Sequence, residues 1–246
     1  MRSITVSVVS HGHAGLLPGL IEDLLGCPEI ERVILTCNIV EPDITVRQTA
    51  RLSTIHNPKP KGFGANHNAA FHDVRTPYLA ILNPDIRLQG NPFPALLACV
   101  ENEVAALCAP AVVNPAGALD DSARQFPSLG DLVLKALGRY EGRLPYQVGD
   151  SPQAAPWVGG MFMLIRREDY VALGGFDEGF FLYYEDVDLC ARIWRSGRRV
   201  VLCPEVQVVH DARRASRRDF RHLRWHLASA ARYFRKHGFR PGLPVS

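Results

Sequence analysis

Five carboxylates lie close together in the segment from Gly174 to Cys190, GGFDEGFFLYYEDVDLC. Aromatic and aliphatic residues surround these acids, which are Asp177, Glu178, Glu185, Asp186 and Asp188. Carboxylates are costly to bury unless they are paired, hydrogen-bonded or used in chemistry. A catalytic base or a metal site would explain such a cluster, and a solvated acidic start of a helix is the simpler alternative.

The last three of these acids stand where we expect a helix to begin. The residue pattern from Tyr183 to Ser196 is helical and is followed by a glycine. A helix N-terminus favours negative charge by roughly 0.3–1 kcal/mol per group, so we expect Glu185 or Asp186 to stay ionised and able to accept a proton. Adjacent helical residues point about 100° apart, which predicts different roles for the two. Asp188 can pair with Arg192 one turn later.

Two more residues suggest metal or diphosphate binding. Asp85 closes an apolar strand within Asn83-Pro84-Asp85, where a carboxylate can hold a divalent cation that bridges a diphosphate. An ordinary Asn-Pro-Asp turn is the alternative. His210 ends the apolar run VQVVH and could complete a metal site with Asp85. A lone histidine at a strand end is more often a surface residue.

The segment Lys59 to Asn68, KPKGFGANHN, could bind phosphate. Its lysines are positively charged, and its glycines precede a predicted helix whose free N–H groups would attract an anion. GFG is not the dinucleotide fingerprint, so a plain turn between a strand and a helix remains the alternative.

Strands and helices alternate along the first 113 residues. We expect strands at residues 3–9, 31–37, 52–56, 78–82 and 105–113, and helices at 15–25, 61–72 and 94–102. This alternation predicts an α/β fold with a mainly parallel sheet and helices on both faces. Ligands of such sheets bind at the carboxyl ends of the strands, where the loops with the polar residues described above would meet.

The second half of the chain is less regular. Residues 114–156 are rich in glycine, proline and polar residues, with one helical candidate at 129–137, and we expect a connecting region that forms a mobile wall. A strand at 157–165, a helix at 167–173, short strands at 199–202 and 206–210, and a basic helix from about 217 to 237 follow. We therefore expect one α/β domain over residues 1–210 and a basic amphipathic extension over 211–246.

Composition narrows the cellular setting. None of the 246 residues belongs to an uncharged apolar run of the roughly 18 residues that a membrane span needs, and the first residues lack a signal-peptide pattern. The six cysteines form no CxxC pair, which favours reduced thiols in the core over a zinc or redox site. We expect a cytoplasmic protein.

Charge is distributed unevenly along the chain. Residues 1–191 contain 14 Lys and Arg against 22 Asp and Glu, whereas residues 192–246 contain 14 against 3. The C-terminal helix carries Leu223, Leu227, Ala230, Ala231 and Phe234 at helical spacing, with arginines largely elsewhere. Such a helix can lie on an anionic membrane, or it can pack its apolar stripe on the domain. No nucleic-acid-binding motif accompanies it, so we expect no nucleic-acid partner.

Six segments, taken in order, resemble family 2 glycosyltransferases of the GT-A fold, especially the rhamnosyltransferase-like branch. They are TVSVVSHG, NPKPKGFGANHNAAF, YLAILNPDIRL, WVGGMFMLIRR, GGFDEGFFLYYEDVDLCARIWRSGRRV and PEVQVVH, and they extend from about residue 4 to residue 210. The resemblance implies a Rossmann-like mixed sheet. It also implies an inverting transfer of a sugar, such as rhamnose, from a nucleoside-diphosphate sugar to a hydroxyl of a glycan or lipid-linked acceptor.

The resemblance also implies roles for individual residues. Asp186 would be the general base, with Glu185 beside it, and Asp85 and His210 would hold Mg²⁺ or Mn²⁺ at the donor diphosphate. The expected donor-binding residues are Ser10, His11, Asn38, Lys61, Gly62, Gly64, Asn68, Asn83, Trp157, Gly159 and Gly160. The donor would be dTDP-rhamnose or a UDP-sugar. A peripheral membrane contact and a homodimer are compatible with the branch.

Three positions depart from the family pattern. His11-Gly12 replaces the usual Tyr/Phe-Asn pair after the first strand, and Cys37 stands where the second strand usually delivers an aspartate to the nucleobase. Asn83 replaces the first acid of the DxD metal motif. The two missing acids keep one alternative open, a non-catalytic sugar-nucleotide or glycan-binding protein on the same fold. The basic C-terminal helix leaves a second alternative, a peripheral membrane scaffold.

Overall fold

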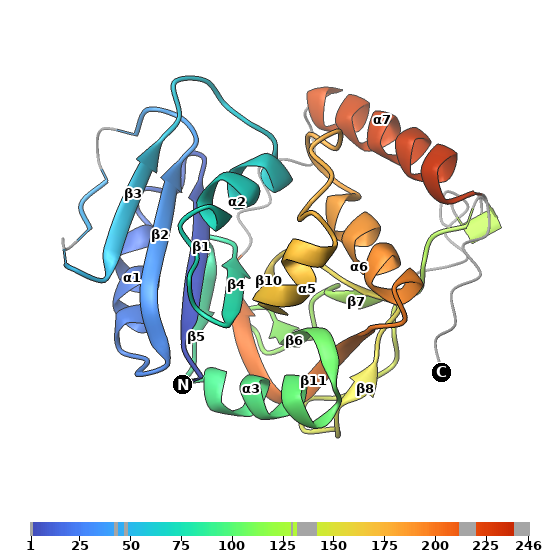
Figure 1. Cartoon of the computed structure of the whole chain (residues 1–246), viewed down its shortest axis with the longest axis horizontal. Coiled ribbons are helices and arrows are strands. Elements are labelled where there is room, and N and C mark those ends of the chain that lie inside the picture. The colour runs from blue at the N-terminus through green and yellow to red at the C-terminus, as the bar shows by residue number, and fades with distance from the viewer. Residues whose placement is uncertain are drawn as a thin grey trace.

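The computed structural model describes residues 2–41, 44–46, 49–128, 130–131, 142–211 and 220–238. Among these residues, nine strands form one mixed sheet in the order β3-β2-β1-β4-β10-β6-β11-β5, with β8 paired to β11 (Figure 1). The sheet strands are β1 (Ile4–Ser10), β2 (Ile30–Cys37), β3 (Leu52–His56), β4 (Tyr78–Leu82), β5 (Ile86–Leu88), β6 (Ala105–Val113), β8 (Gln153–Ala154), β10 (Phe162–Arg166) and β11 (Arg199–His210). Strands β7 (Ala123–Arg124) and β9 (Trp157–Val158) form a separate antiparallel pair.

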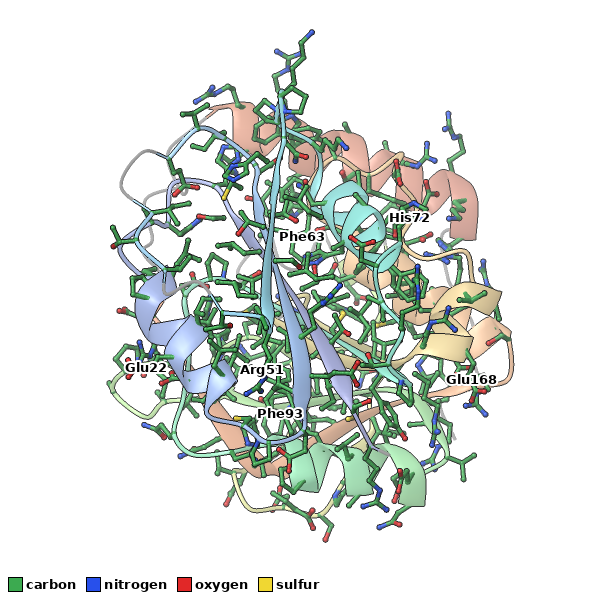
Figure 2. The ribbon with its side chains drawn as sticks, turned by 60° about the vertical axis from the view of Figure 1, so that its left-hand side comes forward. Glu22, Arg51, Phe63, His72, Phe93 and Glu168 are labelled. Carbon is green, nitrogen blue, oxygen red and sulfur yellow. The ribbon has the colours of Figure 1, made fainter. Side chains whose placement is uncertain are left out.

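The helices cover both faces of the sheet, as predicted for an α/β fold. Buried residues of α1 (Leu17–Leu25) and α3 (Phe93–Asn102) form one apolar cluster with the sheet. Residues of α2 (Phe63–Phe71), α5 (Arg167–Ala172) and α6 (Glu185–Arg195) belong to a second cluster. Exposed Glu22 of α1 and Glu168 of α5 lie toward opposite sides of the view in Figure 2.

Strands β7 and β8 lie in the region that was expected to be a connection, and the predicted elements differ from the structure at four other places. The expected strand at 157–165 is interrupted by a Gly-Gly corner into β9 and β10, and β5 was expected to be loop. The two strands expected at 199–202 and 206–210 are one strand, β11, with a register shift between Cys203 and Gln207. Residues 130 and 131 of the expected helix at 129–137 are helical, and the rest of that helix and the start of the basic helix at 217 lie outside the described residues.

The fourth difference concerns the start of α6, which was expected at Tyr183. Tyr183 and Tyr184 instead have φ angles of 69° and 66°, in the left-handed region, and the helix begins at Glu185. Positive φ is uncommon for residues other than glycine, and such strain clusters at functional sites. The sharp turn separates the aromatic segment from the acidic end of the helix.

The basic helix α7 (Phe220–His237) packs on α6 (Figure 1). Ala230, Tyr233 and Phe234 of α7 form an apolar cluster with Val187 and Ala191 of α6. The stripe predicted for this helix is therefore divided, because Ala230 and Phe234 are buried on the domain while Leu223 and Leu227 are 54% and 60% exposed. The division of the chain at residue 210 stays a prediction.

Candidate active site

The carboxyl ends of the first three strands lie level with one another. The parallel register pairs Ser10 of β1 with Cys37 of β2, and Cys37 with His56 of β3. The loops that follow these strands therefore meet at one edge, as predicted. Ser10 is buried, and its hydroxyl accepts a hydrogen bond from the backbone N–H of His13, while His11 is exposed at the same edge.

Three asparagines hold the start of the KGFG segment at this edge. The Asn38 amide accepts a hydrogen bond from the Lys61 backbone N–H (2.8 Å) and donates one to the Lys61 carbonyl (2.9 Å). Asn57 donates to the side-chain oxygens of Asn38 and Asn66, and Asn66 in turn donates to the Gly62 carbonyl. Because both ends of the Asn38 amide serve this network, Asn38 positions the loop in this structure. Its predicted direct contact with the donor stays untested.

The glycines of the KGFG segment allow a close approach to the segment that precedes α6. A Cβ atom at Gly62 would lie 2.6 Å from the Phe181 carbonyl oxygen, which accepts a hydrogen bond from the Phe63 backbone N–H (2.9 Å). A Cβ atom at Gly64 would lie 2.6 Å from Phe176 Cβ. Both glycines therefore have a packing role, which the phosphate-binding hypothesis did not include, and the predicted phosphate contact remains a prediction.

Asn68 fastens the same two segments together. Its side-chain oxygen accepts hydrogen bonds from the Phe176 backbone N–H and the Tyr170 hydroxyl, and its nitrogen donates to Phe176 and Glu178. Helix α2 is also fixed to β1 through His67, whose Nδ1 lies 2.8 Å from the Ser7 hydroxyl. Burial lowers the pKa of His67 to about 3, so this imidazole is neutral.

Asp186 accepts hydrogen bonds through both carboxylate oxygens. Its Oδ2 accepts from the Gly160 backbone N–H (3.1 Å), and its Oδ1 accepts from the N–H of Val187 (2.8 Å) in the first turn of α6. Burial raises the pKa of Asp186, although these N–H groups oppose the rise. A carboxylate held in one orientation, with a pKa moved toward neutrality, suits a general base.

Glu185 lies in a more enclosed environment than Asp186. It is 5% exposed, and its Oε2 is buried without a hydrogen-bond partner among the described residues. Burial and the charge of Asp186 raise the pKa of Glu185 well above its usual range. At Glu185, desolvation opposes ionisation more than the helix N-terminus favours it, and the expectation that Glu185 or Asp186 stays ionised remains a prediction. The predicted division of roles between the two acids agrees with their different surroundings.

His210 lies between two carboxylates. β11 pairs with β5 so that His210 is opposite Ile86, next to Asp85. Its Nε2 is 3.3 Å from Asp85 Oδ2, and its Nδ1 is 2.7 Å from Asp120 Oδ2. Burial lowers the pKa of His210, but the two carboxylates outweigh it and raise the pKa to about 9. His210 is 9% exposed, so it is not the surface histidine of the simpler interpretation.

Asp85 retains one oxygen that could bind a cation. Among the described residues, no group of three or more His, Cys, Asp and Glu side chains is arranged to hold a metal ion by itself. Asp85 Oδ1, however, is buried and has no hydrogen-bond partner in the described part of the chain. Mg²⁺ is commonly held by one or two carboxylates together with substrate phosphates. Asp85 therefore fits a cation that arrives with a diphosphate.

The segment from Gly159 to Met161 connects the two acidic centres. The Gly160 N–H donates to Asp186, and the Met161 carbonyl accepts from the N–H of Asn83 (2.9 Å), two residues before Asp85. A Cβ atom at Gly159 would lie 3.2 Å from the Met161 side chain and 3.9 Å from Asp186 Oδ2. The corner between β9 and β10 thus brings Asp186 and the Asn-Pro-Asp segment to a common wall.

Trp157 begins that wall. Its indole N–H donates to the Gln125 carbonyl (2.8 Å), which fixes the ring against the segment that follows β7. Trp157 and Gly159 were predicted to line the donor and acceptor side of the site. The structure places Gly159 beside Asp186, and a contact of either residue with substrate remains a prediction.

Asp177 and Asp188 bind the basic helix. Asp188 is fully buried and accepts hydrogen bonds from Arg192, as predicted, and also contacts Lys236 and His237 of α7. Asp177 pairs with Arg232 and Lys236. Burial opposes ionisation at both sites, but these basic partners lower the pKa of both carboxyls. These two acids are structural, and they join α7 to the segment that carries Asp186.

Sequence reasoning missed Asp120, the second carboxylate at His210. It lies in the Gly- and Pro-rich region after β6 that we expected to be a mobile wall. The adjacent acids Asp120 and Asp121, placed just after an apolar strand, were the available signal. All six cysteines are buried and free, as predicted.

The profile described as "Glycosyltransferase like family 2" matches residues 35–228. The chain belongs to the family 2 glycosyltransferases. It is 32% identical over 245 residues to rhamnosyltransferase WbbL of Escherichia coli strain K12. That match covers 94% of this chain and 92% of WbbL. It is also 32% identical over 151 residues to an N-acetylglucosaminyl-diphospho-decaprenol L-rhamnosyltransferase of Mycobacterium tuberculosis strain H37Rv. That match covers 58% of this chain and 49% of the mycobacterial protein.

Solved glycosyltransferases share the fold. GalNAc-T7, solved with UDP, GalNAc and Mn²⁺, superposes with a TM-score of 0.64 at 14% identity, over 87% of this chain and 44% of that one. The Pyrobaculum calidifontis mannosyltransferase PcManGT, solved with GDP-Man and Mn²⁺, superposes with a TM-score of 0.60 at 16% identity. That match covers 93% of this chain and 64% of the mannosyltransferase. The predicted GT-A fold is confirmed. This family 2 glycosyltransferase is an enzyme, which removes the alternative of a non-catalytic binding protein.

Proposed function

We propose that this glycosyltransferase moves a sugar from a nucleoside-diphosphate sugar to an acceptor hydroxyl, with inversion at the sugar C1. The observation that supports this most directly is the common wall at Gly159 to Met161, which is bonded to Asp186 on one side and to the Asn-Pro-Asp segment on the other. A base and a diphosphate site on opposite sides of one corner suit attack from the face opposite the leaving group.

Asp186 takes the proton of the acceptor hydroxyl as the C1–O bond forms. The hydrogen bonds from Gly160 and Val187 orient the carboxylate, and burial moves its pKa toward the range in which a base accepts a proton at neutral pH. Glu185 stays protonated beside it, because two ionised carboxylates in a buried pair repel each other.

Asp85 and His210 serve the departing diphosphate. Mg²⁺ or Mn²⁺ bound at Asp85 would offset the negative charge that grows on the leaving group. His210, held by Asp120 and 3.3 Å from Asp85, would provide a further contact to the metal or the diphosphate. Asn83 supplies an amide where a second acid would raise the affinity for the metal.

The relatives suggest the substrates. Two of them are named as rhamnosyltransferases, and one of these as acting on N-acetylglucosaminyl-diphospho-decaprenol. We propose a deoxyhexose donor such as dTDP-rhamnose, with a UDP-sugar as the second choice. We also propose a lipid-linked acceptor used in cell-surface polysaccharide synthesis.

The experiment incubates the purified chain with each donor, a lipid-linked acceptor and Mn²⁺ or Mg²⁺, and follows the release of nucleoside diphosphate and the anomeric configuration of the product. We expect inverted product, and we expect Asp85→Asn to weaken donor binding and the response to metal. Retention of configuration would contradict the mechanism, and an unchanged metal titration in Asp85→Asn would remove the metal role of Asp85.

We further propose that the first half of α7 touches the cytoplasmic face of an anionic membrane. Leu223 and Leu227 are exposed, and Arg221, Arg224 and Trp225 in the same half of the helix line a groove of about 320 Å³. The Trp225 ring packs against Phe181, which is 41% exposed. Apolar side chains among arginines suit the headgroup region of anionic lipid. Among the described residues, no helix has the length and apolar character of a membrane span.

Sedimentation with vesicles tests this contact. We expect binding to vesicles that contain phosphatidylglycerol, and a several-fold loss in the double variant Leu223→Ser/Leu227→Ser. Val171→Ser on α5 is the matched control, because Val171 is 53% exposed on another helix. Equal binding to neutral and anionic vesicles, or equal loss in the control, would contradict the proposal.

A further inference from the structure

A cavity of about 320 Å³ lies beyond the carboxyl ends of β2 and β3. Its volume is at the lower end of the roughly 300–1,000 Å³ that is usual for small-molecule pockets. Ile39, Ile44 and Val46 supply aliphatic side chains, and Glu41 and Thr54 supply polar groups. Apolar walls with a few polar groups suit a flat heterocyclic ring, whose faces are apolar and whose edge carries hydrogen-bonding groups.

Glu41, which lines this cavity, has one carboxylate oxygen without a hydrogen bond among the described residues. Glu41 Oε2 accepts from the backbone N–H of Ala14 (2.9 Å), which anchors the carboxylate to the loop after β1. Glu41 Oε1 is buried and has no partner among the described residues. A buried charged acceptor without a donor is costly, and an ionised carboxylate can only accept. This oxygen therefore matches an incoming N–H group.

The carboxylate lies near the end of β2, where Cys37 stands. Burial and the charge of Glu41 both raise the pKa of the Cys37 thiol, so Cys37 is a neutral and weak hydrogen-bond donor. Asn38, the next residue, uses its amide to hold Lys61 and Asn57. Neither Cys37 nor Asn38 can take the role of the aspartate that the family usually has at the end of β2. Glu41 supplies a carboxylate near that place.

We propose that Glu41 selects the nucleobase of the donor, by accepting a hydrogen bond from the ring N–H of uracil or thymine through its Oε1. This inference rests on the proposed use of a nucleoside-diphosphate sugar. A single available oxygen matches the single ring N–H of these two bases. Thr54 lines the same cavity, and its hydroxyl can donate to a ring carbonyl.

The same geometry disfavours the other bases. Cytosine has a lone pair on the ring nitrogen at the corresponding position, which the carboxylate oxygen repels. Guanine presents two adjacent N–H donors, and the second oxygen of Glu41 is already bonded to Ala14. Guanine would thus leave one donor without a carboxylate partner.

Calorimetric titration of the full chain with UDP, TDP, CDP and GDP, each with Mn²⁺, tests the proposal. Because the four share the diphosphate, differences in affinity report on the base. We expect UDP or TDP to bind at least about tenfold more tightly than CDP and GDP, the effect of one charge-assisted hydrogen bond. Glu41→Gln retains an acceptor for Ala14, and we expect it to weaken the binding of UDP and TDP by about 10- to 100-fold. We expect it to strengthen the binding of CDP, because the amide N–H₂ replaces the oxygen that repels the cytosine ring nitrogen.

Glu31→Gln is the matched control, because it removes the same charge from an exposed residue at the other end of β2. We expect it to bind all four nucleotides as the wild type does. If Glu41→Gln fails to fold, Glu41→Asp replaces it. Glu41→Asp keeps the charge and withdraws the carboxylate by one methylene. It should also weaken the binding of UDP and TDP selectively.

The outcomes separate this inference from the proposed function. If the wild type binds UDP or TDP and transfers sugar, but the Glu41 variants keep the same preference among bases, Glu41 has no role in selection and the proposed function stands. Equal affinity of the wild type for CDP and UDP would also overturn the inference. If the wild type binds none of the four nucleotides, the proposed function and the inference fall together.

Discussion

At the scale of single residues, neighbouring acids in one segment do unlike work because their surroundings differ. Asp186 receives two backbone hydrogen bonds, Glu185 has an oxygen without a partner, and Asp188 is surrounded by basic groups. Burial acts on all three, and the available partners decide whether the pKa ends above or below its usual range.

Glu185 gives a prediction about the pH dependence of stability. Its pKa is raised above the ordinary 4.5, so the folded chain holds this proton more tightly than the unfolded chain. As pH rises above about 4.5, the unfolded state loses the proton first, and stability falls by up to about 1.4 kcal/mol per pH unit until the folded pKa is reached. Glu185→Gln removes this dependence.

We therefore expect Glu185→Gln to match the wild type near pH 4 and to exceed it in stability at pH 7. Urea unfolding at a series of pH values measures the difference. A difference that does not change with pH, or a variant less stable at pH 7, would show that Glu185 is ionised in the folded protein.

At the scale of elements, the site depends on the close approach of α2 to the segment that precedes α6. Gly62→Ala would place a methyl group 2.6 Å from the Phe181 carbonyl oxygen and weaken its hydrogen bond with Phe63. We expect a loss of about 1–3 kcal/mol in the free energy of unfolding, as for other overpacked sites.

Gly15→Ala is the matched control, because a Cβ atom at Gly15 meets no other atom within 4 Å. Urea unfolding of the two variants should show a loss at Gly62 and almost none at Gly15. Equal stabilities would mean that the backbone of residue 181 moves away at little cost.

The sequence predicted the regular elements better than the irregular ones. The strands at 78–82 and 105–113 have the predicted bounds, because short apolar runs between turn residues are strong local signals. The positive φ angles of Tyr183 and Tyr184 have no such signal, since tyrosine rarely adopts them, and the predicted helix therefore began too early.

The same limit applies to the site. Asp186, Asp85 and His210 follow recognisable patterns at the ends of elements. The partnership of Asp120 with His210, and the network that joins Asn38, Asn57 and Asn66, depend on contacts between residues far apart in the chain. Only the register of the sheet and the packing of the loops bring these residues together.

At the scale of the whole molecule, the uneven charge has two uses. Arg232, Lys236 and His237 in the second half of α7 pair with Asp177 and Asp188, so part of the basic excess binds the acidic body of the same chain. The first half carries the exposed leucines and arginines that we assign to the membrane. One helix would thus connect the segment that bears the base to the surface from which a lipid-linked acceptor arrives.

The most direct test of Asp186 as the base is the transfer rate of Asp186→Asn, measured together with donor binding. The amide retains the shape, and its single oxygen can accept one of the two hydrogen bonds from Gly160 and Val187, but the amide cannot take a proton. Glu168→Gln, an exposed acid on α5 (Figure 2), is the control for charge. We predict that Asp186→Asn folds and binds donor as the wild type does. We predict that its kcat is about 10²–10⁴-fold lower than that of the wild type. Near-normal turnover in Asp186→Asn would contradict its role as the base.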